Sequence, residues 1–347
     1  MIPSDLNLIA RSVLREFGLS SLELTSLGNR GGFSGAALWR VKRPGGDLCL
    51  RAWPVSGVSE ERLLRIHHLM ELARNKGLAF VPAILQFRDG VSFVKQANRY
   101  WEVTTWMPGV AASPARVTRA QVQAACTALA RLHVVWAASS SSSAPCPGIQ
   151  RRLEAVREWE NRVQPALRSP HLAGLRSVGQ ISNPSHTLNR QWTDPATPWT
   201  KRAEQLLQIH GGKISVKLGA WIDRSLPLQS CLCDIWHDHV LFEGDVVTGL
   251  VDYGGVKLDH VALDLARLLG SLVEDRTELR STGLEAYSRI RPLSLEEDEL
   301  VSVLDETGML VGLMTWLKWL YVDVKPFDDR ASAARRLQAL VERVERW

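Results

Sequence analysis

The feature that most constrains the fold of this chain is a pair of aspartates separated by a short apolar hairpin. Asp234 precedes two mainly apolar runs, at 240–242 and 247–251, and Asp252 follows the second run directly. A glycine–aspartate pair between the runs is typical of a hairpin turn. Adjacent antiparallel strands bring the start of the first run and the end of the second to one edge. We therefore expect both carboxylates to face one cleft.

Two acids in this arrangement suit phosphoryl transfer by the kinase route. One carboxylate accepts the proton of the attacking hydroxyl, and another holds Mg²⁺ against the nucleotide phosphates. The protein-kinase signature places a metal-binding asparagine five residues after the catalytic aspartate. In this chain that position is His239. Because Mg²⁺ prefers oxygen ligands, an imidazole there favours a metal such as Mn²⁺, which accepts nitrogen more readily.

The whole segment resembles the aminoglycoside phosphotransferase and choline kinase superfamily, which is protein kinase-like. Its catalytic segment reads H-G-D-x-x-x-x-N, then a hairpin, then D-W/F-G. On this resemblance Asp234 is the catalytic base, and Asp252 and His239 stand at the metal-binding positions. Residues 264–269, D-L-A-R-L-L, match the family's helix whose aspartate buttresses the catalytic loop. Where the family has His-Gly before the catalytic aspartate, this chain has Leu-Cys at 232–233.

The resemblance extends upstream to the nucleotide side. Arg51 occupies the strand position where kinases carry a phosphate-pairing lysine, and Trp106 and Met107 match the end of the hinge between lobes. The acid that would pair with Arg51 from the helix at 59–75 is left open, with Glu60 and Glu61 as candidates at the solvated helix start. The glycine-rich stretch resembles the phosphate-covering loop, with Gly31, Gly32, Ser34 and Gly35 as its binding residues. The resemblance implies ATP and Mg²⁺, or Mn²⁺, as cofactors.

Hydrophobic periodicity predicts an α+β protein with a small β-rich N-lobe and a larger helical C-lobe. The composition changes after Pro108, so we place the nucleotide-covering lobe at 1–108 and the helical lobe, with catalytic loop and substrate region, at 109–347. The expected N-lobe elements are helices at 5–17 and 59–75 and strands at 22–27, 37–41, 48–53, 91–96 and 100–106. The C-lobe pattern predicts helices at 119–138, 149–163, 201–210 and from 263 onward, with a flexible loop at 139–148 and an irregular stretch at 165–198.

Composition excludes several other classes of function. The net charge of +5 is spread without a basic run longer than two, so we expect no nucleic-acid partner. No apolar run approaches the ~18 residues of a membrane span, and the N-terminus lacks a signal-peptide core, so we expect a cytoplasmic protein without a membrane partner. Five scattered cysteines argue against a disulfide framework.

The favoured function is ATP-dependent transfer of a phosphate to a hydroxyl of a small molecule. The main alternative is a pseudokinase, that is, a nucleotide-binding or scaffold protein. In that case His239, in place of asparagine, would have impaired the metal site. A transition-metal site made by Cys231, Cys233, His237 and His239 has ligand spacings tighter than usual zinc sites. No activating base identifies a nucleophilic cysteine, and the P-loop and G-x-S-x-G patterns are absent. The acceptor and the oligomeric state stay open.

Overall fold

The computed structural model describes residues 4–19, 22–28, 35–87, 90–139, 142–168, 196–325, 327 and 330–346. The chain divides into two compact units, and each is built from two stretches of sequence. The first unit comprises Met1–Ser141 with Gln229–Leu293, and the second comprises Ser142–Leu228 with Ser294–Trp347. All the described residues of the predicted site belong to the first unit.

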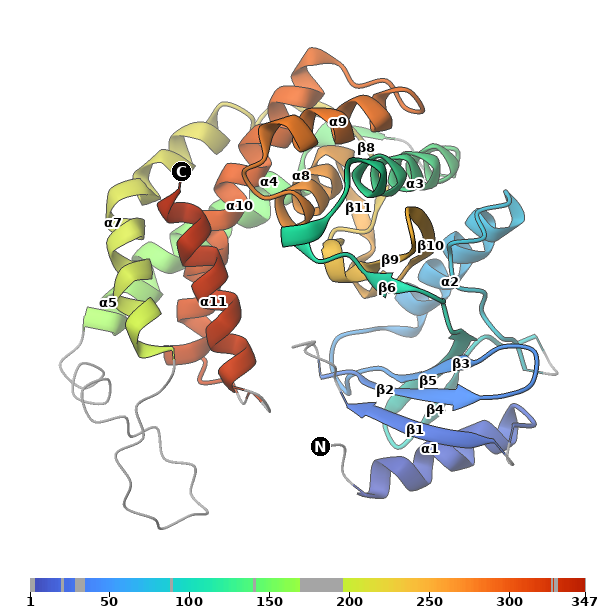
Figure 1. Ribbon diagram of the computed structural model, residues 1–347. Helices are drawn as coiled ribbons and strands as arrows, with labels where there is room; N and C mark the ends of the chain where they lie inside the picture. Colours follow the sequence, from blue (N-terminus) through green and yellow to red (C-terminus); the bar gives the residue numbers. More distant parts are fainter. Residues whose placement is uncertain are drawn as a thin grey trace, which may run out of the picture. The chain divides into compact units, whose positions relative to one another are not determined.

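The N-terminal part of the first unit is an antiparallel five-stranded sheet in the order β1-β2-β3-β5-β4. Its strands are β1 (Glu23–Gly28), β2 (Ala37–Lys42), β3 (Leu48–Ala52), β4 (Val94–Gln96) and β5 (Arg99–Thr105). One face is covered by α1 (Ser4–Glu16), drawn in dark blue in Figure 1. The buried α1 residues Val13 and Leu14 share a core with Trp39 and Trp101, whose rings stack 5.4 Å apart. This core explains the alternating burial along β2 and β3.

Two helices connect the sheet to the rest of the first unit. Helix α2 (Glu60–Asn75) begins at Ser59, whose hydroxyl accepts a hydrogen bond from Arg62 N, as the sequence predicts for a helix cap. Helix α3 (Arg119–Ala137) begins with a capping box between Thr118 and Gln121. The indole of the buried Trp136 on α3 donates to the Leu69 carbonyl of α2, 2.9 Å away. The two helices are therefore fixed against each other.

The predicted hairpin is present as β9 (Val240–Glu243) and β10 (Val246–Leu250), and β6 (Val110–Ala111) pairs with β9 on its other side. The hairpin is followed in the chain by β11 (Lys257–Asp259), α8 (Val261–Leu272) and α9 (Thr277–Ser288). In the first unit, β11 pairs with the end of β8 (Ser225–Cys231). The hairpin and α8 occupy the positions that the sequence assigned to them, whereas β8 was not anticipated.

The second unit is mainly helical. It contains α4 (Pro147–Glu158), a π-helical turn (Trp159–Val163), α5 (Gln164–Arg168), α7 (Thr197–Gly219), α10 (Leu295–Tyr321) and α11 (Arg330–Glu345). By length and composition α10 could cross a membrane, contrary to the expectation from apolar runs. More than half of its most apolar 18-residue window is buried in the protein, and α10 packs against α4, α7 and α11. We therefore interpret α10 as the core helix of this unit (Figure 1).

Two expectations for the second unit are wrong. The stretch expected to be a loop includes a strand, β7 (Ser142–Pro145), which pairs with the start of β8 through long-range contacts invisible to local pattern. The helix expected at 201–210 runs from Thr197 to Gly219, because Gly211 and Gly212 lie within it without ending it. A third expectation is wrong in part: most of the stretch expected to be irregular, 165–198, lies outside the described residues, but 165–168 belong to α5 and 197–198 begin α7.

Candidate active site

The loop that carries Asp234 is held from below by a fully buried aspartate. Asp264, on the first turn of α8, accepts hydrogen bonds from the backbone N–H groups of Leu232 and Cys233, both at 2.7 Å. This is the buttress that the resemblance implies. Each carboxylate oxygen accepts one of these two N–H groups. The backbone of the two residues directly before Asp234 is therefore fixed relative to α8.

A buried histidine supports this aspartate in turn. His133 on α3 contacts Asp264 through Nε2, at 3.0 Å, and the Tyr287 hydroxyl through Nδ1, at 2.7 Å. The tautomer that satisfies both contacts has its proton on Nε2 and accepts from Tyr287. Burial lowers the pKa of His133 even though Asp264 acts in the opposite direction. The ring is therefore neutral in the folded protein at pH 7.

Cys233, directly before Asp234, has a left-handed backbone conformation with φ +60°. The family pattern has glycine here, the residue that adopts this conformation without a steric penalty. Cys233 is thus a strained position next to the proposed base, a consequence that the sequence analysis did not anticipate.

The four-ligand transition-metal site is not assembled. Among the described residues, the only compact group of three or more potential ligands joins Cys231 to His133 and Asp264 instead. Both Asp264 oxygens and both His133 nitrogens already have protein partners. We interpret this group as a hydrogen-bonded core.

The Asp234 carboxylate is paired with Arg267, the fourth residue of the D-L-A-R-L-L motif at 264–269, which sequence pattern did not predict as part of the site. Asp234 is 56% exposed, and its Oδ1 accepts a hydrogen bond from the Arg267 guanidinium. Arg267 lies three residues after Asp264 on α8, and residues at this spacing share a helix face. The three-residue spacing from Asp264 could have predicted this contact, because the face of α8 that carries Asp264 also carries Arg267.

His239 braces the loop instead of presenting a free nitrogen. Its Nδ1 contacts the Asp234 carbonyl oxygen at 2.9 Å, and its Nε2 accepts a hydrogen bond from the Trp236 indole at 2.8 Å. Burial lowers the pKa of His239, despite the opposing effect of Asp252. The ring is neutral, and in this conformation both nitrogens are engaged.

Asp252 ends the hairpin with its backbone in the left-handed region, at φ +64°. Its Oδ1 lies 3.0 Å from Arg51 Nη2, and Oδ2 lies 3.7 Å from His239 Nε2. Desolvation alone would raise the pKa of Asp252, but the charge of Arg51 and its hydrogen bond bring that pKa below its usual range. The structure thus brings together three predicted site residues: Arg51, His239 and Asp252.

The second partner of Arg51 comes from a strand and not from α2. Glu102 lies opposite Arg51 in the β3–β5 register, with its Oε1 3.8 Å from Arg51 Nε. Its Oε2 accepts from the Trp53 indole at 2.9 Å and contacts His67 Nε2 at 2.7 Å. Burial alone would raise the pKa of Glu102, but the His67 hydrogen bond and the Arg51 charge lower it.

Helix α2 therefore contributes an imidazole to this cluster. Glu60 and Glu61, the candidates from its first turn, are exposed to solvent. Sequence pattern does not identify Glu102 as a partner of Arg51, because the pairing depends on strand register and not on spacing within the chain.

The segment expected to be the hinge contacts the N-terminal sheet through Trp106 and the β9–β10 hairpin through Met107. The backbone of Trp106 donates to the Asp47 carbonyl, and the guanidinium of Arg40 lies 4.7 Å from the Trp106 ring centroid. Met107 is buried, and a Cβ on Gly249 would come within 2.7 Å of its Cβ. The two sides of the site are thus in direct contact at this point.

The glycine-rich loop is described only at its end. Gly31, Gly32 and Ser34 lie outside the described residues. Gly35 has φ +77°, and its carbonyl accepts a hydrogen bond from Arg99, which also donates to Trp53 O. Arg99 thus connects the end of the glycine-rich loop to Trp53, the residue that follows β3.

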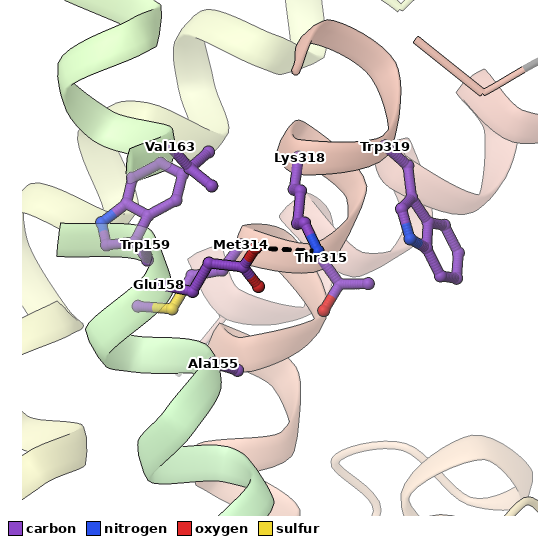
Figure 2. Close-up of a pocket in the computed structure, with 8 residues that line it drawn as sticks. All are labelled: Ala155, Glu158, Trp159, Val163, Met314, Thr315, Lys318 and Trp319. Atoms are coloured by element: carbon purple, nitrogen blue, oxygen red, sulfur yellow. Dashed lines mark ion pairs between the residues drawn. The ribbon is translucent and has the colours of Figure 1, made fainter. Parts of the chain in front are cut away.

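A small cavity of about 70 Å³ lies within the second unit (Figure 2). Figure 2 shows Trp159 and Val163 on one side and α10 residues, including Trp319, on the other, with a Glu158–Lys318 ion pair of 3.0 Å between them. That volume holds a few water molecules, well short of a nucleotide or a sugar. We therefore do not assign this cavity as an acceptor site.

Comparison with known proteins gives a consistent result. Residues 27–299 match the model of the family described as the phosphotransferase enzyme family. A homoserine kinase from Beijerinckia indica subsp. indica is 27% identical over 274 residues, which are 76% of this chain and 72% of that protein.

Solved structures share the fold. A spectinomycin phosphotransferase in complex with ADP and spectinomycin superposes with a TM-score of 0.65 at 11% identity, covering 98% of this chain and 97% of that one. A microcompartment-associated aminopropanol kinase gives a TM-score of 0.57 at 16% identity, with coverages of 97% and 95%. Both likenesses include the antiparallel N-terminal sheet and the helical C-terminal region.

Proposed function

Since this chain belongs to the phosphotransferase enzyme family, we propose that it transfers the γ-phosphate of ATP to a hydroxyl of a small molecule. The observation that carries the proposal is the arrangement of two acids at the ends of one hairpin, with Arg51 on Asp252 and a rigidly braced loop under Asp234. We further propose that residues 1–108 cover the nucleotide, that 109–347 carry catalysis and acceptor binding, and that the protein is cytoplasmic.

Asp234 takes the role of orienting the acceptor hydroxyl and receiving its proton. Its exposure leaves room for a ligand, and the Asp264 braces fix the loop that presents it. A positioned base typically contributes 10²–10⁴-fold to rate. Catalysis on this proposal depends mainly on holding the hydroxyl in line with the phosphate.

Arg51 and the 31–35 loop take the nucleotide phosphates, and Trp106 and Met107 border the base. The oxygen donors suit a divalent cation: Asp252 supplies carboxylate oxygens, and Asp238 is half exposed nearby in sequence. When bound, Mg²⁺ or Mn²⁺ neutralises charge on the phosphates. The engaged nitrogens of His239 fit the role of a brace better than that of a ligand, because its Nε2 lone pair faces the Trp236 N–H.

The acceptor is the part of this proposal that an experiment must supply. Relatives named homoserine kinase and a structural neighbour named aminopropanol kinase motivate a panel of amino alcohols, with and without a carboxylate. The purified chain would be incubated with Mg-ATP or Mn-ATP and L-homoserine, 3-aminopropan-1-ol, choline or spectinomycin. Acceptor-dependent ADP release, with a new phosphate ester by ³¹P NMR, supports the proposal. ADP binding without transfer to any acceptor would contradict it.

One observation favours a second candidate, a nucleotide-binding protein without turnover. His239 stands where the family has asparagine, and neither of its nitrogens is open to a metal here. His239→Asn separates the two candidates. If the native chain is inactive and the variant gains Mg²⁺-dependent transfer, the protein is a pseudokinase that lost activity at this residue.

A further inference from the structure

We propose that Arg51 is an internal counter-cation at the metal position, so that a divalent cation binds tightly only once nucleotide phosphates have drawn the guanidinium from Asp252. The inference rests on the proposed function, in which Asp252 holds the metal. It adds an order of binding: nucleotide and metal enter together, and the bare metal is excluded by the protein's own charge.

The contacts of Asp252 show where the competition lies. Oδ1 accepts hydrogen bonds from Arg51 at 3.0 Å and from Gly254 N at 3.3 Å, while Oδ2 faces His239 at 3.7 Å. A guanidinium and a divalent cation cannot both occupy the same face of one carboxylate oxygen. A metal approaching Asp252 in the nucleotide-free protein therefore meets a fixed positive charge at about hydrogen-bond distance.

Arg51 can leave Asp252 without leaving another acid unpaired. Glu102, its second partner, keeps the hydrogen bonds to His67 and Trp53. The looser Arg51–Glu102 contact, at 3.8 Å, anchors the base of the guanidinium, and the Trp53 ring lies 5.1 Å from its carbon. The Arg51 guanidinium thus has two acidic partners: Glu102 keeps it in place, and Asp252 can be exchanged for phosphate. Phosphate groups carry more charge than one carboxylate and can bind the same donors bidentately.

Competition of this kind makes the two ligands help each other. If phosphates remove Arg51 from Asp252, nucleotide raises metal affinity, and metal raises nucleotide affinity by the same factor. Coupling between two sites usually amounts to about 5–150-fold. Replacing Arg51 with a neutral side chain should therefore raise the metal affinity of the nucleotide-free protein by part of this factor.

The test measures Mn²⁺ binding by electron paramagnetic resonance, with no acceptor and no turnover. Native chain, Arg51→Met and Arg51→Lys would be titrated with MnCl₂, alone and with saturating ADP. We expect Arg51→Met to bind Mn²⁺ at least about fivefold more tightly than the native chain without nucleotide. Its gain in Mn²⁺ affinity from ADP should shrink correspondingly. Lysine is shorter and cannot span both acids, so Arg51→Lys should change in the same direction by a smaller factor.

Two further variants make the result specific. Lys42→Met removes a cation from the same sheet, where it pairs with the exposed Glu23, and should leave Mn²⁺ binding unchanged. Circular dichroism confirms folding, and if Arg51→Met does not fold, Arg51→Lys decides. Unchanged or weaker Mn²⁺ affinity in the folded Arg51 variants overturns the inference alone. Undiminished Mn²⁺ binding by Asp252→Asn in the presence of ADP instead overturns the metal role of Asp252, and with it that part of the proposed function.

Discussion

The carboxylate of Asp234 is paired with Arg267, which lies on the same face of α8 as Asp264, the residue that braces the Asp234 loop. One helix thus fixes both the backbone before the proposed base and the base itself. The pairing holds one carboxylate oxygen and leaves the other for a hydroxyl. It also places a positive charge beside any acceptor that Asp234 binds.

Arg267→Gln should lower the transfer rate by about tenfold to a hundredfold, because a misplaced base loses much of its positioning effect. Nucleotide affinity should stay within a few-fold of the native value, since Arg267 contacts Asp234, the proposed general base, and not Asp252. Arg267→Lys, which keeps the charge, should lose less. Steady-state kinetics with the acceptor found in the panel measures both. Arg289→Gln, which removes an exposed pair with Glu285, is the control. A native transfer rate in Arg267→Gln would show that the pairing is incidental.

The two acids should fail differently when each is changed to its amide. Asp252→Asn should weaken Mg-nucleotide binding as well as transfer, because it removes a charged oxygen ligand. Asp234→Asn should keep nucleotide affinity within a few-fold while lowering the transfer rate by about 10²–10⁴. Calorimetric titration of Mg-ATP into each variant, together with rate measurements, distinguishes them. The opposite pattern of nucleotide affinities would reverse the assigned roles.

Cys233→Gly should stabilise the protein by about 1 kcal/mol, because a side chain in the left-handed region is strained and glycine is not. Urea unfolding measures the free energy of unfolding. Cys49→Gly, at a β3 position with ordinary strand geometry, should destabilise the protein and serves as the matched control. Equal losses in both variants would mean that the strain at Cys233 is already relieved by its surroundings.

Two buried tyrosines should respond oppositely to loss of their hydroxyls. The Tyr253 hydroxyl has no hydrogen-bond partner among the described residues, whereas that of Tyr287 bonds to His133. An unsatisfied buried polar group costs about 1–3 kcal/mol. Tyr253→Phe should therefore raise the melting temperature, and Tyr287→Phe should lower it. A fall in both would indicate that Tyr253 has a partner in the folded protein in solution.

Stability should decline as the pH falls from about 7 toward 5, because of His133. Burial lowers its pKa in the folded protein, so the unfolded chain binds the extra proton first, below the ordinary value of about 6.5. Protonation in this range therefore favours unfolding. Urea unfolding at several pH values should give a shallower slope for His133→Gln than for the native chain. His68→Gln, at an exposed position on α2, should keep the native slope. An identical slope in all three chains would assign the effect to other groups.

The sequence predicted what depends on local pattern and missed what depends on distant pairing. The cap at Ser59 and the turn at Gly244 allowed α2 and the hairpin to be located, and the two acids followed from the hairpin. By contrast, β8 contains Pro227 and polar residues, so its strand character comes from its partners β7 and β11. Glu102 and Arg267 belong to the same class, because register and helix packing bring each one to its partner.

The compact unit that holds both acids is discontinuous in sequence, since 142–228 separates its two stretches. During synthesis, the residues of the N-terminal sheet and of α3, which ends at Ala137, leave the ribosome well before Asp234 does. Until then His133 has no Asp264 to contact, and Arg51 has no Asp252. The Arg51–Asp252 contact is therefore among the last parts of this unit to form, because a nascent chain stalled before residue 252 would carry Arg51 without the carboxylate that it pairs with in the folded protein. In this protein, the Asp264 contacts that brace the Asp234 loop can form only after translation has passed the first turn of α8.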